Sequence, residues 1–95
     1  MARLSVSRQA KRDLAEIFLF IARDSIDAAG RMRGRLQECG QTIAKQPNIG
    51  REREEYGPGV RSLAAGNYVI FYKQARTVSI IRVLHGARDS RNLLT

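Results

Sequence analysis

Apolar residues near the start of the chain recur at the spacing of an α-helix. Their positions are Ala10, Leu14, Ile17, Phe18 and Ile21. Steps of three and four residues place these side chains on one face of a helix. Ser7 directly precedes the segment and is a good N-cap, because its hydroxyl can accept a hydrogen bond from an amide of the first turn. The pattern therefore predicts an amphipathic helix over residues 8–23.

A second stripe of the same kind follows a polar break at residues 24–27. Its members are Ala29, Met32, Leu36, Cys39 and Ile43. Pro47 ends this helix, because the residue before a proline is pushed out of the helical conformation. Gly30, Gly34 and Gly40 weaken the helix by about 1 kcal/mol each relative to alanine, but they also let a neighbour approach closely. Two such helices joined by a short break predict an antiparallel hairpin whose stripes face one core.

The second half of the chain is typical of β-strands. Residues 60–65, 68–72 and 78–85 predict three strands, the first two joined by a two-residue turn at Gly66-Asn67. A short β-prone segment at residues 3–6 precedes the first helix. The order of elements predicts an α+β fold, in which an N-terminal strand and a helical hairpin accompany a three- to four-stranded antiparallel sheet. The length of 95 residues fits a single domain, residues 1–95.

The segment between the helices and the strands contains glycine, proline and a mixed charge run. We expect a loop over residues 48–59, with the run at 51–55 exposed to solvent. The strand at 68–72 carries apolar side chains on both faces. One face is expected to pack on the helices, and the other to be covered by the C-terminal segment or by a partner.

Charge and composition limit the kinds of partner and binding site that the protein is expected to have. Seventeen Lys and Arg against nine Asp and Glu give a net charge of +8, which favours an acidic partner, either a nucleic acid or a protein. No apolar run reaches the length of a membrane span and no secretion signal starts the chain, so we expect a cytoplasmic protein without membrane contact. A lone Cys39 and a lone His85 cannot supply a zinc site. Neither a metal nor a cofactor is expected, and Cys39 on the second stripe is interpreted as a core residue.

Several blocks of residues, in their order and spacing, point to one family. They are Ala10, Asp13 and Leu14-Ala15-Glu16-Ile17 in the first helix, Pro47 and Gly50-Arg51 after the second, Arg61, the run 68–72, and the run 82–89. Together they resemble the ParE branch of the ParE/RelE toxin superfamily over nearly the whole chain. The resemblance implies a toxin of a type II toxin–antitoxin system that inhibits DNA gyrase by protein–protein contact. It also implies a hetero-oligomer with an acidic, DNA-binding antitoxin. RelE relatives share the fold but cut mRNA on the ribosome, and a basic binding module without toxicity is a third interpretation.

The nuclease alternative needs a proton acceptor for the ribose hydroxyl and cations for the phosphorane. His85 is the only imidazole, and Arg61 and Arg82 are cations on the predicted strands. These three residues form the alternative catalytic set. Strand alternation places Arg82 on the face of Ile80 and Leu84, with His85 on the opposite face, although twist and a bend at Gly86 could bring them together near the strand end. A structural role for His85 at a strand end is the preferred interpretation.

Partner contacts are expected at two places. The antitoxin is expected to lay an amphipathic helix along the hairpin, and it could also add a strand to the sheet edge. The residues expected to contact the antitoxin are Leu14, Phe18, Ile21, Met32 and Leu36. The resemblance implies a role in toxicity for the C-terminal end, so the expected target-binding residues are Arg82, Arg88, Arg91, Leu93 and Leu94.

Overall fold

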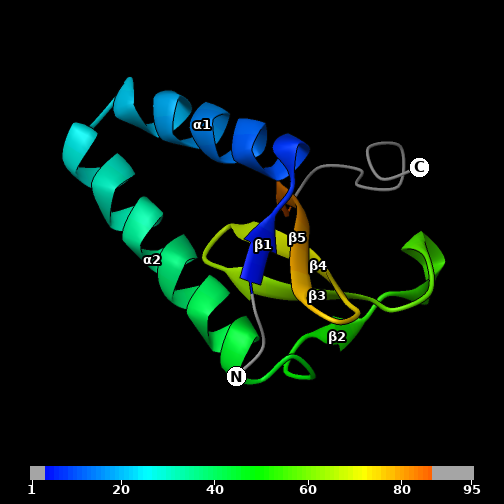
Figure 1. Ribbon diagram of the computed structural model, residues 1–95. Helices are drawn as coiled ribbons and strands as arrows, with labels where there is room; N and C mark the ends of the chain where they lie inside the picture. The colour runs from blue at the N-terminus through cyan, green and yellow to red at the C-terminus, as the bar shows by residue number, and fades with distance from the viewer. Residues whose placement is uncertain (1–3, 87–95) are drawn as a thin grey trace.

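A helical hairpin packs on one face of a five-stranded sheet (Figure 1). The computed structural model describes residues 4–86. Its elements are β1 (Leu4–Val6), α1 (Arg8–Ala22), α2 (Ile26–Lys45), β2 (Arg51–Glu52), a 3₁₀ turn (Glu54–Tyr56), β3 (Val60–Ala65), β4 (Tyr68–Gln74) and β5 (Val78–His85). The α+β fold, the hairpin and the three long strands were thus correctly predicted. No helix within residues 4–86 has the length and apolar character needed to cross a bilayer.

The sheet differs from the prediction in size and in the direction of one strand. Its order is β1-β5-β4-β3-β2, and β1 runs parallel to β5 while the other pairs are antiparallel. The expected antiparallel sheet of three to four strands was therefore wrong in these details. Two residues of β2 are too few to show an alternating pattern. The direction of β1 relative to β5 depends on the path of the chain through the two helices. The alternation of apolar and polar residues within a strand contains no information about that path.

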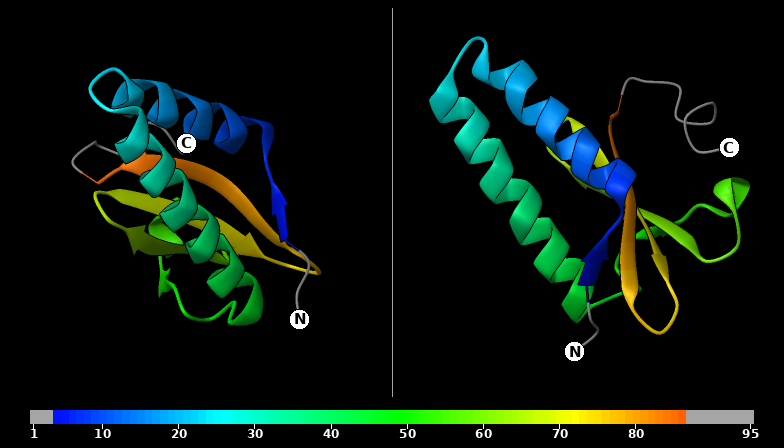
Figure 2. Two further views of the ribbon diagram at one scale, coloured as in Figure 1. Left: turned by 90° about the vertical axis from the view of Figure 1, so that its left-hand side faces the viewer. Right: turned by 45° about the horizontal axis from the view of Figure 1, so that its top comes forward.

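Serine caps fix the start of each helix. The Ser7 hydroxyl accepts the amide of Ala10 at 3.0 Å and donates to the carbonyl of Ile81 at 3.0 Å. It therefore caps α1 and also ties it to β5. The Ser25 hydroxyl accepts the amide of Ala28 at 3.1 Å at the start of α2. From this tip the two helices diverge toward the sheet, as Figure 1 and the right-hand view of Figure 2 show.

The main core lies between the helices and the sheet. Its buried members include Ala10, Ile17, Leu36, Ile43, Tyr68, Ile70, Tyr72, Val78, Ile80 and Val83. Half-buried Cys39 packs against this core, in agreement with its interpretation as a core residue. A smaller cluster on the other face of the sheet contains Val60, Phe71 and Leu84.

The segment before β3 covers part of that second face, so the expectation of a plain loop was wrong. Tyr56 contacts the Phe71 ring edge-on, with the ring centroids 5.4 Å apart. The Arg53 guanidinium lies 4.9 Å from the Tyr56 centroid and 5.5 Å from that of Phe71. Arg53 also donates its backbone amide to Val60. Arg53 can pack against this apolar cluster, although it is charged, because its planar guanidinium stacks on the two aromatic rings.

A bulge in β5 changes which residues share a face. Phe71 pairs with Arg82, but the next residue, Tyr72, pairs with Ile80, so Ile81 is an extra residue in β5. Ile80 consequently belongs to the main core and Leu84 to the cluster on the other face. The predicted common face for Arg82, Ile80 and Leu84 was therefore wrong, because strict alternation fails at a bulge.

Candidate functional site

An apolar groove of about 790 Å³ opens between the diverging helices, and we call it the hairpin groove. Its apolar lining includes Leu14, Phe18, Met32 and Leu36 on the helices and Ile70, Ile80 and Val83 on the sheet. Gly40 also lines it, and a Cβ added there would lie 3.5 Å from the Leu4 side chain, which is ordinary van der Waals contact. The groove exposes apolar surface that a partner could bury.

Polar groups of α2 edge the hairpin groove. Arg33, Gln37 and Gln41 contribute to its lining. The Arg33 guanidinium lies 5.8 Å from the centroid of the Phe18 ring, so a cation stands directly beside an apolar wall. This combination is suited to a segment that carries apolar residues on one face and carboxylates at its margin.

Four of the five residues expected to contact an antitoxin line the hairpin groove. They are Leu14, Phe18, Met32 and Leu36. Ile21 does not line it and packs against the main core. Exposed Leu4 and Leu19 also contribute to the lining of the groove. Sequence reasoning missed both, because neither belongs to the two helical stripes.

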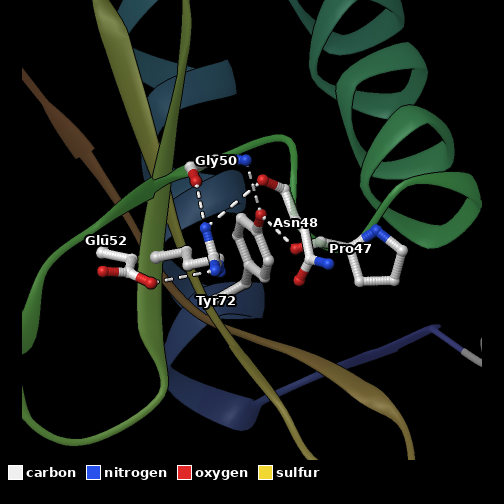
Figure 3. A network of polar contacts seen from close by, with 6 residues as sticks. Pro47, Asn48, Gly50, Glu52 and Tyr72 are labelled. Atoms are coloured by element: carbon white, nitrogen blue, oxygen red, sulfur yellow. Dashed lines mark hydrogen bonds and ion pairs between the residues drawn. The ribbon is translucent and has the colours of Figure 1, made fainter.

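Arg61 fastens the segment that follows α2, whose Pro47, Asn48 and Gly50 are shown with Tyr72 in Figure 3. Its guanidinium donates to the carbonyl of Gly50 at 2.7 Å and to that of Asn48 at 3.3 Å, and it pairs with Glu52 at 3.2 Å. The neighbouring Tyr72 hydroxyl donates to the carbonyl of Pro47 at 2.7 Å and accepts the amide of Gly50 at 2.9 Å. The Arg61 donors are therefore used within the fold.

Gly50 is required in that network by space. A Cβ built on Gly50 would lie 2.5 Å from the Tyr72 hydroxyl and 2.9 Å from the carbonyl oxygen of Ser62. Both distances are far below van der Waals contact, and the second involves backbone that does not move easily. The glycine thus allows the chain to pass directly over Tyr72.

Arg82 is held by a carboxylate of α1. Its Nε and Nη2 atoms donate to the two oxygens of Asp13 at 2.8 and 3.0 Å, and the Val83 amide donates to the same carboxylate at 3.0 Å. The hydrogen bonds that Arg82 donates to Asp13 raise the pKa of Arg82 above its ordinary value. The Arg82 side chain is only 14% exposed. Sequence reasoning missed Asp13 as its partner, although a carboxylate three residues after Ala10 and four before Ile17 lies on the buried stripe.

The alternative catalytic residues are not brought to one place. His85 lies opposite Tyr68 and Arg61 lies opposite Tyr72, so the two positions are four residue steps apart along β4. At a strand rise of 3.3 Å per residue this is about 13 Å along the sheet. His85 packs edge-on against Tyr68, with the ring centroids 5.4 Å apart. Arg82 binds Asp13 of α1, and His85 lines a groove to which Asp13 also contributes.

The remaining expected target-binding residues, Arg88, Arg91, Leu93 and Leu94, lie outside the described residues. Only Arg82 of that set has a described position, in the pair with Asp13.

Comparison with known proteins identifies the family. The sequence model of the family described as "ParE toxin of type II toxin-antitoxin system, parDE" matches residues 4–90. Toxin ParE1 of Caulobacter vibrioides is 36% identical over 87 residues, which cover 90% of this chain and 91% of that protein. Toxin ParE1 of Mycobacterium tuberculosis is 35% identical over 96 residues, covering 97% and 98%.

The fold matches a solved structure as well. A chain of the chromosomal ParDE TA system from P. aeruginosa superposes with a TM-score of 0.74 at 21% identity, covering 90% of this chain and 96% of that chain. This likeness supports the fold, and the two sequence relatives and the family match carry the assignment. The chain belongs to the ParE toxins of type II toxin–antitoxin systems.

Proposed function

We propose that this ParE-family toxin inhibits DNA gyrase by protein–protein contact and is not a nuclease. The observation that carries the proposal is the placement of the three residues that a nuclease would use. His85 and Arg61 lie about 13 Å apart along β4, and Arg82 is bound to Asp13 at 2.8 Å. Cleavage of RNA needs a base and cations around one phosphate, and this arrangement does not supply them together.

Expression of the toxin in a bacterial host tests the target. DNA synthesis and protein synthesis are followed separately in the first minutes after induction, and purified toxin is added to a gyrase supercoiling reaction. We expect DNA synthesis to fail first, with a DNA-damage response, and supercoiling to be inhibited. Early failure of protein synthesis, with mRNA cut at codon positions, would establish the RelE-like activity instead. Removal of residues 91–95 should blunt toxicity if the C-terminal segment contacts the target.

The second part of the proposal is that an acidic antitoxin neutralises the toxin by occupying the hairpin groove. The apolar walls and the volume of about 790 Å³ suit an amphipathic helix. Arg33 at the margin offers a guanidinium to a carboxylate of such a helix, and the net charge of +8 favours encounter with an acidic protein. The relative from P. aeruginosa comes from a ParDE system, which supports the expectation of an antitoxin and of a toxin–antitoxin hetero-oligomer.

Affinity measurements on groove variants test this part. Phe18→Ala and Met32→Ala each shorten a half-buried side chain of the groove and should weaken antitoxin binding by about tenfold. Glu38→Ala is the control, because Glu38 is exposed on α2 and does not line the groove. Urea denaturation of each variant separates a binding defect from a folding defect. Equal affinities for the groove variants and the control would place the antitoxin elsewhere.

A further inference from the structure

A second groove, of about 520 Å³, lies between α1 and the adjoining ends of β4 and β5. We call it the β5 groove. It is lined by α1 residues that include Glu16, Leu19 and Phe20, and by Leu84 and His85 of β5. No residue of α2 lines it, so it is separate from most of the hairpin groove, with which it shares Leu19 and two core residues. Leu19 and Phe20 are 66% and 67% exposed, which is unusual for large apolar side chains.

We infer that the chain's own C-terminal segment, residues 87–95, occupies the β5 groove. The position at which the chain leaves β5 supports this. His85 lines the groove, and the Gly86 amide donates to the carbonyl of Asn67 at 2.8 Å, which fixes the end of β5 beside Tyr68. The described chain therefore ends at Gly86, directly after a residue that lines the groove.

The segment is long enough to reach the exposed apolar side chains. Nine extended residues span up to about 30 Å. The α1 residues that line the groove, from Asp13 to Phe20, cover only about 10 Å of helix axis. The segment therefore reaches Leu19 and Phe20 even if it bends once on the way.

Its chemistry matches that of the groove. Leu93 and Leu94 supply the apolar side chains that would cover Leu19 and Phe20. Arg88 and Arg91 can approach Glu16, which is exposed on the α1 wall. Asp13, the other carboxylate of the groove, is already bound to Arg82, and Arg23 is the cation that lines the groove. The inference does not depend on gyrase being the target, because it concerns only contacts within one chain; a target that binds this segment would first have to displace it from the β5 groove.

Disulfide trapping in the full-length protein tests the inference. In a Cys39→Ser background, Phe20→Cys is combined with Leu94→Cys and the protein is oxidised with oxidised glutathione. The control combines Ile26→Cys with Leu94→Cys, because Ile26 is 66% exposed, as Phe20 is 67%, but does not line the groove. We expect the Phe20 pair to form an intramolecular disulfide about tenfold faster than the Ile26 pair, reflecting a higher effective concentration.

Two results would overturn the inference. Equal rates for the two pairs would mean that the C-terminal segment is not held in the β5 groove. Disulfides between chains at the Phe20 position would mean that a second copy supplies the segment. A second measurement keeps Phe20 intact: a nitroxide on Thr95→Cys, in the same Cys39→Ser background, should broaden the methyl resonances of Leu19 more than those of Leu4. Equal broadening of the two leucines would count against the proposal in the same way.

Discussion

Asp13 of α1 binds Arg82 of β5 with both carboxylate oxygens and also accepts the backbone amide of Val83. The pairing of β1 with β5 ends at Val6 and Ile80, so beyond that point β1 no longer covers the edge of β5. There the Asp13 carboxylate accepts the hydrogen bond of the Val83 amide, which a carbonyl of a neighbouring strand would otherwise accept. The contact therefore fixes α1 to β5 and protects the strand edge from other pairing.

Removal of the Asp13 carboxylate should destabilise the fold strongly. Asp13→Ala leaves the largely buried Arg82 without its partner, and the expected loss in the free energy of unfolding is about 3 kcal/mol, measured by urea denaturation. Glu52→Ala removes the more exposed pair with Arg61 and should cost less than about 1 kcal/mol. If the two variants lose the same stability, the Asp13–Arg82 pair contributes no more than a surface ion pair.

The Tyr72 hydroxyl should contribute measurably to stability. Tyr72→Phe leaves the Gly50 amide and the Pro47 carbonyl without their partner, and the expected cost is about 2 kcal/mol. Tyr68→Phe is a matched control, because Tyr68 is also a buried tyrosine of β4, but its hydroxyl does not belong to this network. Denaturation midpoints of the two variants are compared directly. A cost for Tyr68→Phe as large as for Tyr72→Phe would argue against the role of the network.

Glycines of α2 should respond differently from Gly50. A Cβ at Gly30 or Gly34 would meet no atom within 4 Å, so Gly30→Ala and Gly34→Ala should each stabilise the protein by about 0.5–1 kcal/mol. Gly50→Ala should destabilise it, because the added Cβ overlaps Tyr72. Thermal unfolding of the three variants measures the effect. A loss of stability in the α2 variants would show that the helix needs these glycines for a reason other than space.

His85 should be dispensable for toxicity. His85→Ala removes the edge contact with Tyr68 and should cost about 1 kcal/mol of stability at most. Growth arrest after induction in a host without the antitoxin should persist, because the proposed inhibition of gyrase uses no general base. A folded His85→Ala protein that no longer arrests growth would instead support a nuclease.

Periodicity predicted most of this fold because helices and long strands repeat their pattern many times. The spacing of apolar residues located both helices, and residue type located the Ser7 cap and the three long strands. Four of the five side chains expected at an antitoxin contact line one groove, since they belong to the stripes that define the hairpin.

The features that sequence reasoning missed depend on contacts between distant residues or on a single irregular residue. The bulge at Ile81 reverses the faces of the following residues, and no local pattern marks it. Asp13 and Arg82 are 69 residues apart, so their pairing becomes evident only when α1 lies against β5. The distance of Arg61 from Arg82 and His85 could not be predicted for the same reason, because Arg61 lies on β3 and the other two lie on β5, so that distance depends on register.

The parallel pairing of β1 with β5 has a consequence for the timing of synthesis. The first strand of the chain pairs with residues 78–80, and β5 also supplies Ile80 and Val83 to the hairpin groove. The ribosome makes the chain from its N-terminus and encloses the newest part in its exit tunnel, so β5 emerges last. Neither the sheet nor the hairpin groove can be completed before β5 has left the exit tunnel. A partner of the hairpin groove therefore meets its complete binding surface only after β5 has emerged from the ribosome.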